Sequence, residues 1–491
     1  MPQGGLVCLV LILGLTVAAF GQSKPWVTAY LGGWELNTDD NGYLPISAID
    51  FTAMTVVDHF AILPSSSGNF INPVSGYMTA ANARKLIAAA HAAGTKVTVS
   101  MGSWATEPAF RVATDPANLE TFVANLANYV KSRGYDGLDV DWEPFTRSDT
   151  TQWENLIIAL RKALPRPYLL TTTTGWGYPY NAYAAVQQYL DQINIMTYDL
   201  AIPSIGWGVW FAGATYNGGA TVPGEGIQFP ACDNISQDFI DAGVEPSKLG
   251  IGSELGGCMW QGGLIIDGLG KLTGHGATGP GQEWENFQSS ITAAPKFTQD
   301  IPLYDRQGTG IMQKWYSPQT YRWDTTAEAS YLSYSGLNPL EDYFISYDDS
   351  NDIKAKFNFI RKRGLGGIII YELGMGYPGN NTFPMLSVIK AAMQGRSGPI
   401  SIPLAYPVLQ PNYPNPFNPS TTITFELPTQ SNASLRIYDI LGQSVATLVH
   451  GFLAAGPHTY KWNGSRYASG VYLAVLRTTG EVLYQKMLLL K

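Results

Sequence analysis

The chain has 491 residues, more than one ordinary hydrophobic core accommodates, so we expect a large domain and a smaller one. Its formal net charge of −8, without any basic run, argues against nucleic acid or an anionic membrane as a partner. The 28 Tyr and 13 Trp supply flat, partly polar surfaces that suit sugar rings as well as cores, so a neutral substrate fits better.

The first predicted element is a secretory signal peptide over residues 1–21. Residues 6–20 form an apolar stretch that is short for a membrane span, and Ala19-Phe-Gly21 is a small-x-small cleavage site. We expect no other membrane-spanning segment, and we expect the mature protein to be secreted.

From residue 26 to about residue 395, short apolar runs alternate with helical patterns, which is typical of a parallel α/β fold. Helices are predicted over 117–133 and 351–363, each ending before a glycine, Gly134 and Gly364. The predicted strands are 27–31, 54–60, 96–101, 137–142, 168–172, 193–198, 249–253 and 366–371. Eight such strands predict a (β/α)₈ TIM barrel.

The fourth predicted strand is unusually acidic. Asp136, Asp139, Asp141 and Glu143 alternate with apolar residues in the segment that begins at Tyr135. Side chains two apart share one face of a strand, ~6.6 Å apart along the chain, so Asp139, Asp141 and Glu143 should enter one cavity. Their repulsion should keep at least one of them protonated near neutral pH, and such a proton can be given to a leaving group.

Two other interpretations of this acidic strand are a calcium site and a solvated edge strand. Calcium-binding carboxylates usually lie in loops rich in Gly and Asn, whereas these alternate with apolar residues. The five His show no metal-binding spacing, so we expect no metal and no cofactor. Catalysis is favoured because Glu143, Tyr198 and Tyr371 fall at carboxyl ends of strands, where barrels place their chemistry.

Residues from about 254 to 345 separate the seventh and eighth predicted strands by far more than one helix. This segment predicts an α+β insertion domain that raises one wall of a cleft. Cys232 and Cys258 follow neighbouring strands, so a disulfide between them is geometrically possible in an oxidising compartment. The insertion carries dispersed aromatic residues, among them Trp260, Trp284, Trp315, Tyr321 and Trp323.

A Pro-rich linker over residues 396–412 ends the helical pattern. Beyond it, residues 413–491 predict a small all-β, Ig-like sandwich. Its predicted strands are 421–426, 434–438, 445–449, 459–462, 471–476 and 483–490.

The acidic motif Asp136-x-x-Asp139-x-Asp141-x-Glu143 resembles the signature of glycoside hydrolase family 18 chitinases. Met196-Thr-Tyr198-Asp199 is similar to that family's sixth-strand motif, and Trp323-Asp324 is similar to part of its insertion domain. The segments Ser346-Tyr-Asp-Asp349 and Gly364-Leu-Gly-Gly367 are similar to its approach to strand eight. The resemblance covers roughly residues 26–395.

The chain departs from the family pattern at two places. The third strand has Ser100-Met-Gly-Ser103 where the family usually has Ser-x-Gly-Gly, and Tyr371 stands where the eighth strand usually ends in Trp. A smaller ring with a hydroxyl should change affinity or specificity more readily than it abolishes the chemistry.

The resemblance implies a retaining, substrate-assisted mechanism. In it, Glu143 protonates the glycosidic oxygen and then activates water, while Asp141 orients the substrate's 2-acetamido group. The carbonyl oxygen of that group attacks the anomeric carbon and forms an oxazolinium ion. Tyr198 bonds the acetamido group, and Asp139 shares a proton or hydrogen bond with Asp141. The resemblance also implies a set of substrate-binding or supporting residues: Asp136, Ser100, Trp104, Met196, Asp199 and Tyr371.

The segment from Asn412 to Lys491 resembles type IX secretion sorting domains. Matching stretches include Asn412-Tyr-Pro-Asn-Pro-Phe-Asn-Pro-Ser420 and Ala468-Ser-Gly-Val-Tyr472. The resemblance implies the secretion machinery as a partner and an extracellular or cell-surface location. A generic sandwich or carbohydrate-binding module is the alternative, although Trp462 is its only tryptophan.

Together these features predict a secreted, monomeric bacterial endo-chitinase that acts on chitin or N-acetylglucosamine oligosaccharides without a metal. One alternative is an endo-β-N-acetylglucosaminidase that acts on N-glycans, which would share the acidic strand. Another is a non-catalytic chitin-binding lectin, and the presence of Glu143 argues against it.

Overall fold

The computed structural model describes residues 24–37, 42–71, 79–200, 209–222, 226–262, 265–266, 272–274, 278–281, 296–379, 382–395, 407–428, 430–479 and 481–491. The predicted signal peptide, Trp284 and most of the predicted linker lie outside these residues.

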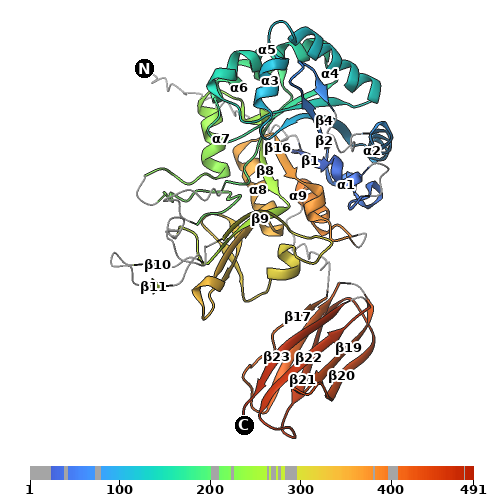
Figure 1. Cartoon of the computed structure of the whole chain (residues 1–491), viewed down its shortest axis with the longest axis vertical. Coiled ribbons are helices and arrows are strands. Elements are labelled where there is room, and N and C mark those ends of the chain that lie inside the picture. Colours follow the sequence, from blue (N-terminus) through green and yellow to red (C-terminus); the bar gives the residue numbers. More distant parts are fainter. Residues whose placement is uncertain are drawn as a thin grey trace, which may run out of the picture.

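Eight parallel strands close into a barrel, in the order β1-β2-β4-β5-β6-β7-β8-β16 and back to β1 (Figure 1). Each overlaps one of the eight predicted strands, so the predicted TIM barrel is confirmed. The strands are β1 (Trp26–Gly32), β2 (Val56–Pro64), β4 (Lys96–Ser103), β5 (Gly137–Trp142), β6 (Leu169–Thr174), β7 (Gln192–Ile195), β8 (Leu249–Glu254) and β16 (Gly367–Tyr371). A short strand, β3 (Phe70–Ile71), pairs with the end of β2.

Helices surround this barrel (Figure 1). α4 and α8 end at Gly134 and Gly364, both in the left-handed conformation, as predicted. The N-cap of α8 is Asp349, whose carboxylate accepts the backbone N–H groups of Asn351 and Asp352. The helices are α1 (Gly33–Leu36), α2 (Ala80–Ala92), α3 (Glu107–Ala113), α4 (Leu119–Arg133), α5 (Thr150–Ala163), α6 (Tyr180–Val186), α7 (Cys232–Asp241), α8 (Ser350–Arg363) and α9 (Pro384–Met393). None of the helices in the described part of the chain has the length and hydrophobicity needed to cross a membrane.

The alternation of side chains along β5 divides an apolar layer from a polar interior. Leu138 and Val140 are fully buried in the main hydrophobic core. Asp139 and Asp141 lie on the opposite face of the strand, and hydroxyl groups from neighbouring strands bond Asp139. Apolar packing therefore holds the strand in place while its acids enter the barrel.

The register between β4 and β5 pairs Ser100 with Asp139 and Gly102 with Asp141. Gly102 has φ of +115°, and a Cβ atom there would lie 1.9 Å from the backbone oxygen of Asp141. Only glycine allows this approach of the two strands.

The insertion forms a five-stranded antiparallel sheet in the order β12-β9-β15-β14-β13. The prediction of an α+β domain is only partly met, because one short helical turn, Ile311–Trp315, and one 3₁₀ turn, Pro339–Glu341, accompany the sheet in the described residues. The strands are β9 (Gly256–Gln261), β12 (Lys296–Pro302), β13 (Tyr321–Asp324), β14 (Ala329–Tyr334) and β15 (Tyr343–Tyr347), with a separate pair β10 (Ile265–Ile266) and β11 (Leu272–Gly274).

The disulfide between Cys232 and Cys258 that the sequence makes possible is not formed, and both cysteines are free and buried. Cys232 opens α7, and its thiol bonds the Thr197 hydroxyl at 3.2 Å. Cys258 lies on β9 in a different apolar cluster, which includes Phe344. The sequence places both after neighbouring strands, but the side chains pack into separate cores.

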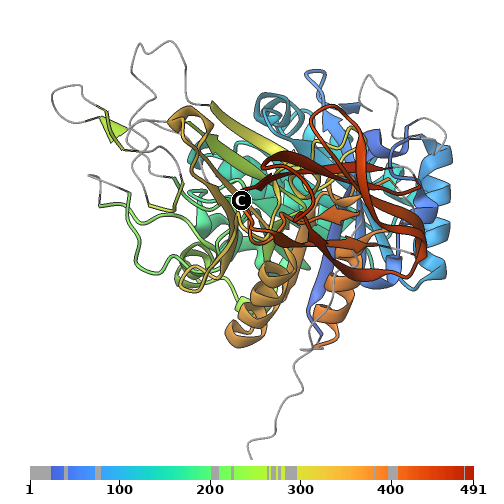
Figure 2. The ribbon, with the colours of Figure 1, turned by 90° about the horizontal axis from the view of Figure 1, so that it is seen from below.

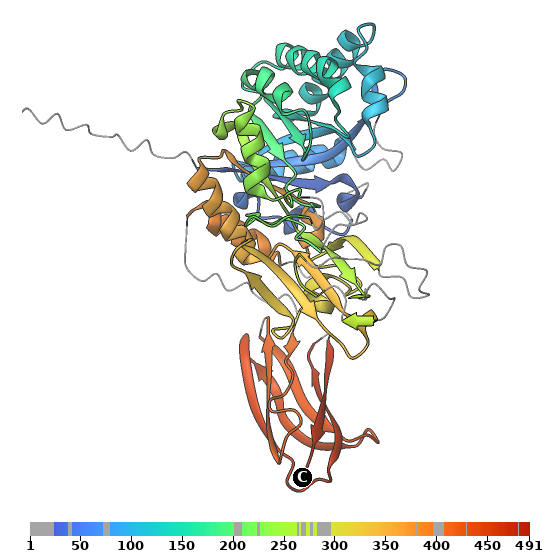
Figure 3. The ribbon, with the colours of Figure 1, turned by 90° about the vertical axis from the view of Figure 1, so that its left-hand side faces the viewer.

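The C-terminal module consists of two antiparallel sheets, which confirms the all-β prediction. Buried and partly exposed residues alternate along β18, as expected for one face on a core. Figures 1 and 3 show this module beyond the insertion sheet. In Figure 2 the molecule is seen from below, with this module in front of the barrel. The sheets contain β17 (Val408–Leu409), β18 (Ser420–Leu427) and β21 (Gly456–Asn463), and β20 (Ser444–Leu453), β19 (Ser431–Tyr438), β22 (Gly470–Arg477) and β23 (Val482–Leu489).

Candidate active site

Three of the predicted acids gather at the carboxyl end of β5. Asp139 and Asp141 are 1% and 3% exposed, and Glu143 follows the strand directly. The backbone oxygen of Glu143 accepts the N–H of Glu107 at 3.1 Å, which ties it to the start of α3. Phe110 of α3 stacks on Trp142 with ring centroids 4.5 Å apart. Packing and a backbone hydrogen bond thus fix the end of the strand that carries the acids.

Asp139 accepts hydrogen bonds from four hydroxyl groups. Thr171 bonds one carboxylate oxygen at 2.5 Å, and Thr173, Ser100 and Tyr30 bond the other at 2.7, 3.2 and 3.3 Å. Burial raises the pKa of Asp139, while these donors oppose that change because they stabilise the carboxylate. The four donors hold the Asp139 carboxyl in one orientation beneath the other acids.

Asp141 and Glu143 share a hydrogen bond and have raised pKa values. Burial, followed by the charges of Glu143, Asp139 and Asp58, holds the pKa of Asp141 well above its usual range. Burial also raises the pKa of Glu143 to about 7, although its hydrogen bond with Asp141 opposes this. A carboxyl that titrates near neutral pH is suited to general acid and base catalysis.

The Oδ1 atom of Asp141 is buried and has no hydrogen-bond partner among the described residues. A buried acceptor without a donor is costly, and such groups in native sites commonly receive a donor from a ligand or water. This atom is therefore positioned to receive a hydrogen-bond donor from a bound molecule.

Tyr178, in the turn after β6, is a site residue that the sequence analysis missed. Its hydroxyl bonds the Glu143 carboxyl and accepts the backbone N–H of Phe145. Burial, and then the charge of Glu143, raises the pKa of Tyr178. Its place just after the carboxyl end of a predicted strand was the available signal, but many aromatic residues of this chain occupy similar places.

Asp58 on β2 is a second buried acid that the sequence analysis missed. It is fully buried and accepts the Thr98 hydroxyl at 2.5 Å. Burial, and then the charge of Asp139, raises its pKa well above the usual range. The signal was a lone acid within the apolar run 54–60. Asp58 extends the line of acids deeper into the barrel.

An aromatic cluster lies beside the acids. The rings of Tyr198 and Tyr371 stack with centroids 5.4 Å apart and an angle of 12°. Phe60 meets Tyr371 edge to face at 6.2 Å, and Met196 packs against the same cluster. The structure thus brings Met196, Tyr198 and Tyr371 together at the carboxyl ends of β7 and β16.

Asp136 does not join the acid cluster. It precedes β5, at the amino end of the strand, and bonds the His91 ring at 2.7 Å and the backbone N–H of Val97 at 2.8 Å. The motif spacing places it near Glu143 in sequence, but the strand separates them in space. Asp136 therefore holds α2 and β4 together at the far end of the barrel.

Trp104 and Asp199 lie at the carboxyl ends of the barrel strands but outside the acid cluster. Trp104 follows β4 and is 71% exposed. Asp199 follows Tyr198, bonds the Gln299 side chain, and its charge raises the pKa of Glu143. Asp199 also approaches Glu254 and Asp300, with carboxylate oxygens of all three within 4.8 Å of one another.

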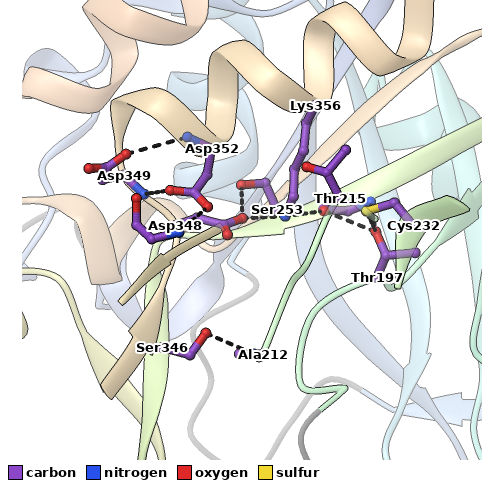
Figure 4. A network of polar contacts seen from close by, with 12 residues as sticks. Thr197, Ala212, Thr215, Cys232, Ser253, Ser346, Asp348, Asp349, Asp352 and Lys356 are labelled. Carbon is purple, nitrogen blue, oxygen red and sulfur yellow. Dashed lines mark hydrogen bonds and ion pairs between the residues drawn. The ribbon is translucent and has the colours of Figure 1, made fainter. Parts of the chain in front are cut away.

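A buried polar network attaches the insertion to the barrel beside this site (Figure 4). Lys356 of α8 is fully buried, pairs with Asp348, and donates to the Gly252 oxygen at 3.0 Å. The Ser253 hydroxyl bonds Asp348, and the Thr197 hydroxyl accepts the Gly252 N–H at 2.7 Å. Thr197 immediately precedes Tyr198, so this network fixes the backbone that carries the aromatic cluster.

Residues 27–376 match the family described as glycosyl hydrolases family 18. The chain belongs to this family. The match extends from Val27 in β1 to beyond β16, and it confirms the family predicted from the acidic motif. Residues 412–490 match the secretion system C-terminal sorting domain, which confirms the second resemblance and indicates a secreted or cell-surface protein.

Two named relatives of this family 18 chain are 28% and 27% identical to it. Chitinase A1 of Niallia circulans is 28% identical over 309 residues, which are 57% of this chain and 40% of the relative. Chitinase 1 of Aphanocladium album is 27% identical over 318 residues, 61% of this chain and 65% of the relative. The chain thus spans less than two thirds of either relative.

A solved structure shares the fold of this family 18 chain. The Group IV chitinase of Ostrinia furnacalis, in complex with allosamidin, aligns with a TM-score of 0.58 and 21% identity. The alignment covers 76% of this chain and all of the other protein. At this identity the likeness concerns the fold.

Proposed function

We propose that this protein is a secreted chitinase that hydrolyses the β-1,4 linkages of chitin by endo attack. The observation that carries the proposal is Glu143, a half-buried carboxyl with a pKa of about 7 that bonds both Asp141 and Tyr178. The printed names of the relatives, Chitinase A1 and Chitinase 1, support the same substrate class.

In the first step, Glu143 gives its proton to the glycosidic oxygen as the bond to the leaving sugar breaks. The 2-acetamido oxygen of the substrate attacks the anomeric carbon and forms an oxazolinium ion. Asp141 accepts the acetamido N–H through its Oδ1 atom, which has no partner among the described residues. This bond orients the acetamido group and stabilises its developing positive charge.

In the second step, the deprotonated Glu143 takes a proton from water as the water oxygen attacks the anomeric carbon. The oxazolinium ring opens, and two inversions give net retention of configuration. Asp139 remains fixed by its four hydroxyl donors beneath Asp141. Its charge contributes to the raised pKa of Asp141, so the two carboxyls titrate as a coupled pair.

Tyr198 and Tyr371 supply the surface for the sugar at the cleavage point. In this proposal Tyr198 bonds the acetamido oxygen, and Tyr371, whose ring stacks on Tyr198, offers an apolar face to the sugar. Trp104, which is 71% exposed at the end of β4, offers a further stacking surface for a longer chain.

The proposal is tested by incubating the purified protein with chitohexaose and, separately, with a high-mannose glycopeptide, and identifying the products by mass spectrometry. Chitinase function predicts short oligosaccharides from chitohexaose and no change in the glycopeptide. Cleavage of the glycopeptide would assign an endo-β-N-acetylglucosaminidase instead. Binding of chitohexaose without cleavage of either substrate would assign a chitin-binding lectin.

A further inference from the structure

We propose that Asp199, Glu254 and Asp300 form a binding site for a calcium ion between the barrel and the insertion sheet. Asp199 follows β7, Glu254 ends β8, and Asp300 lies on β12 of the insertion. One carboxylate oxygen from each lies within 4.8 Å of the other two. Such a spread fits oxygens around one ion, since Ca–O distances are about 2.3–2.6 Å.

Glu254 provides the independent reason to place a cation there. Its side chain is 2% exposed, and both of its carboxylate oxygens are buried with no hydrogen-bond partner in the described part of the chain. The Oδ1 atom of Asp199 is likewise buried without a partner there. Buried carboxylates are normally hydrogen-bonded, paired with a cation or bound to a metal.

Among the described residues around Glu254, no basic side chain serves as its counter-ion. Lys356 is the basic residue whose charge acts on Glu254. Its ammonium group is already taken by Asp348 and by the Gly252 oxygen, as Figure 4 shows for the Asp348 side of the network. The three carboxylates therefore face one another without a protein counter-ion.

The backbone aims two of these side chains into the cluster. Asp199 and Asp300 are non-glycine residues with positive φ values, 52° and 54°. Asp300 lies where the pairing of β12 with β9 is irregular, between Thr298 and Ile301. A bulge of this kind redirects a side chain, here from the insertion sheet toward the barrel.

The chemistry of the donors favours calcium. Carboxylate oxygens select hard cations, and calcium accepts several carboxylates and completes its shell with water. Magnesium prefers smaller octahedral shells and usually keeps several waters with one or two carboxylates. Asp300 is exposed, so the cluster opens to solvent on one side.

The sequence gives no sign of this site, because the three acids come from distant segments and have no diagnostic spacing. The site differs from the catalytic acids, and the proposed hydrolysis needs no ion in any step. A bound ion would tie β12 to the ends of β7 and β8, close to the segment that carries Tyr198.

The test is calorimetric titration of CaCl₂ into the full chain after dialysis against EDTA. We expect saturable binding with a Kd at or below about 1 mM, the range of extracellular calcium sites. We also expect Tm to rise by at least about 2 °C at saturating calcium, because an ion that binds only the folded state stabilises it. Magnesium at the same concentration should bind at least ~10-fold more weakly.

Two variants locate the binding. Asp300→Asn changes an exposed side chain, so it should fold normally and weaken calcium binding at least ~10-fold. Glu254→Gln changes a buried side chain and should also weaken calcium binding at least ~10-fold. Asp241→Asn, an exposed acid on α7, should bind calcium like the parent. Absence of a calcium-dependent heat and Tm change in the parent, or unchanged binding in Asp300→Asn, would overturn the site. Because these readouts do not use hydrolysis, they are independent of the proposed function.

Discussion

Tyr371 at the end of β16 lies parallel to Tyr198 at the end of β7, with ring centroids 5.4 Å apart and an angle of 12°. Tyr371 also meets the edge of Phe60 at 6.2 Å. The family usually has Trp at this position, and here the smaller ring packs against Tyr198, Phe60 and Tyr30. The cluster thus supplies a rigid surface beside Glu143.

Replacing Tyr371 tests this surface. Tyr371→Ala should raise KM for chitohexaose about 2- to 10-fold, because stacking by one aromatic ring contributes about 0.5–1.5 kcal/mol. Tyr371→Phe keeps the ring and should remain near the parent value. Steady-state kinetics of the parent, Tyr371→Ala and Tyr371→Phe gives the three KM values. An unchanged KM in Tyr371→Ala would show that the ring does not contact the substrate.

Tyr178 should set the alkaline limit of activity. Its hydroxyl bonds Glu143 and lowers the pKa of that carboxyl, so Tyr178→Phe should raise the Glu143 pKa above about 7. Glu143 must be protonated to act as the acid, and the alkaline limb of kcat/KM should therefore move to higher pH. The pH profiles of the two proteins measure this shift.

Tyr180→Phe is the matched control, since it removes a hydroxyl from the same segment that bonds the Gly177 N–H instead. Its alkaline limb should coincide with that of the parent. Equal profiles for Tyr178→Phe and Tyr180→Phe would argue against control of Glu143 by Tyr178.

Glu143 should also make stability depend on pH. Its pKa is about 7 in the folded protein, above the ordinary value of 4.5, so the folded state binds this proton more tightly than the unfolded chain does. The resulting stabilisation is present below about pH 4.5 and is lost as pH rises through about 7.

Glu143→Gln removes this proton equilibrium. Between pH 5 and pH 8, the free energy of unfolding should fall less in the variant than in the parent, by up to about 3 kcal/mol. Urea unfolding at the two pH values provides the comparison. The same pH dependence in both proteins would mean that the Glu143 pKa is not raised.

The sorting module should be dispensable for hydrolysis. It has its own hydrophobic core, with Ile423, Phe425, Leu435 and Leu476 fully buried. Deletion of residues 398–491 should leave kcat/KM for chitohexaose within about twofold of the parent, because the proposed catalytic residues and the barrel core lie in the other module. A loss of tenfold or more would contradict this separation.

The parts that sequence predicted well depend on local periodicity. The alternation of apolar residues and acids along β5 was sufficient to place Asp139 and Asp141 on the interior face, and the eight strands followed from their apolar runs. Glycine after α4 and α8 marked the ends of those helices.

What sequence could not predict depends on contacts between distant segments. Tyr178 reaches Glu143 from the turn after another strand, and Asp58 joins Asp139 from β2. The family resemblance placed Asp136 among the supporting residues, but it precedes β5 and bonds His91 and the Val97 N–H instead. Likewise, neighbouring strands suggested that Cys232 and Cys258 could pair, although their side chains enter different cores.

Glu143 is the proposed acid and base of a chitinase. The most direct measurement compares the parent and Glu143→Gln for binding and for hydrolysis of chitohexaose. Loss of the transferable proton with little change of shape should preserve binding and reduce turnover by at least about 10²-fold. Near-parent hydrolysis by Glu143→Gln would contradict this role of Glu143.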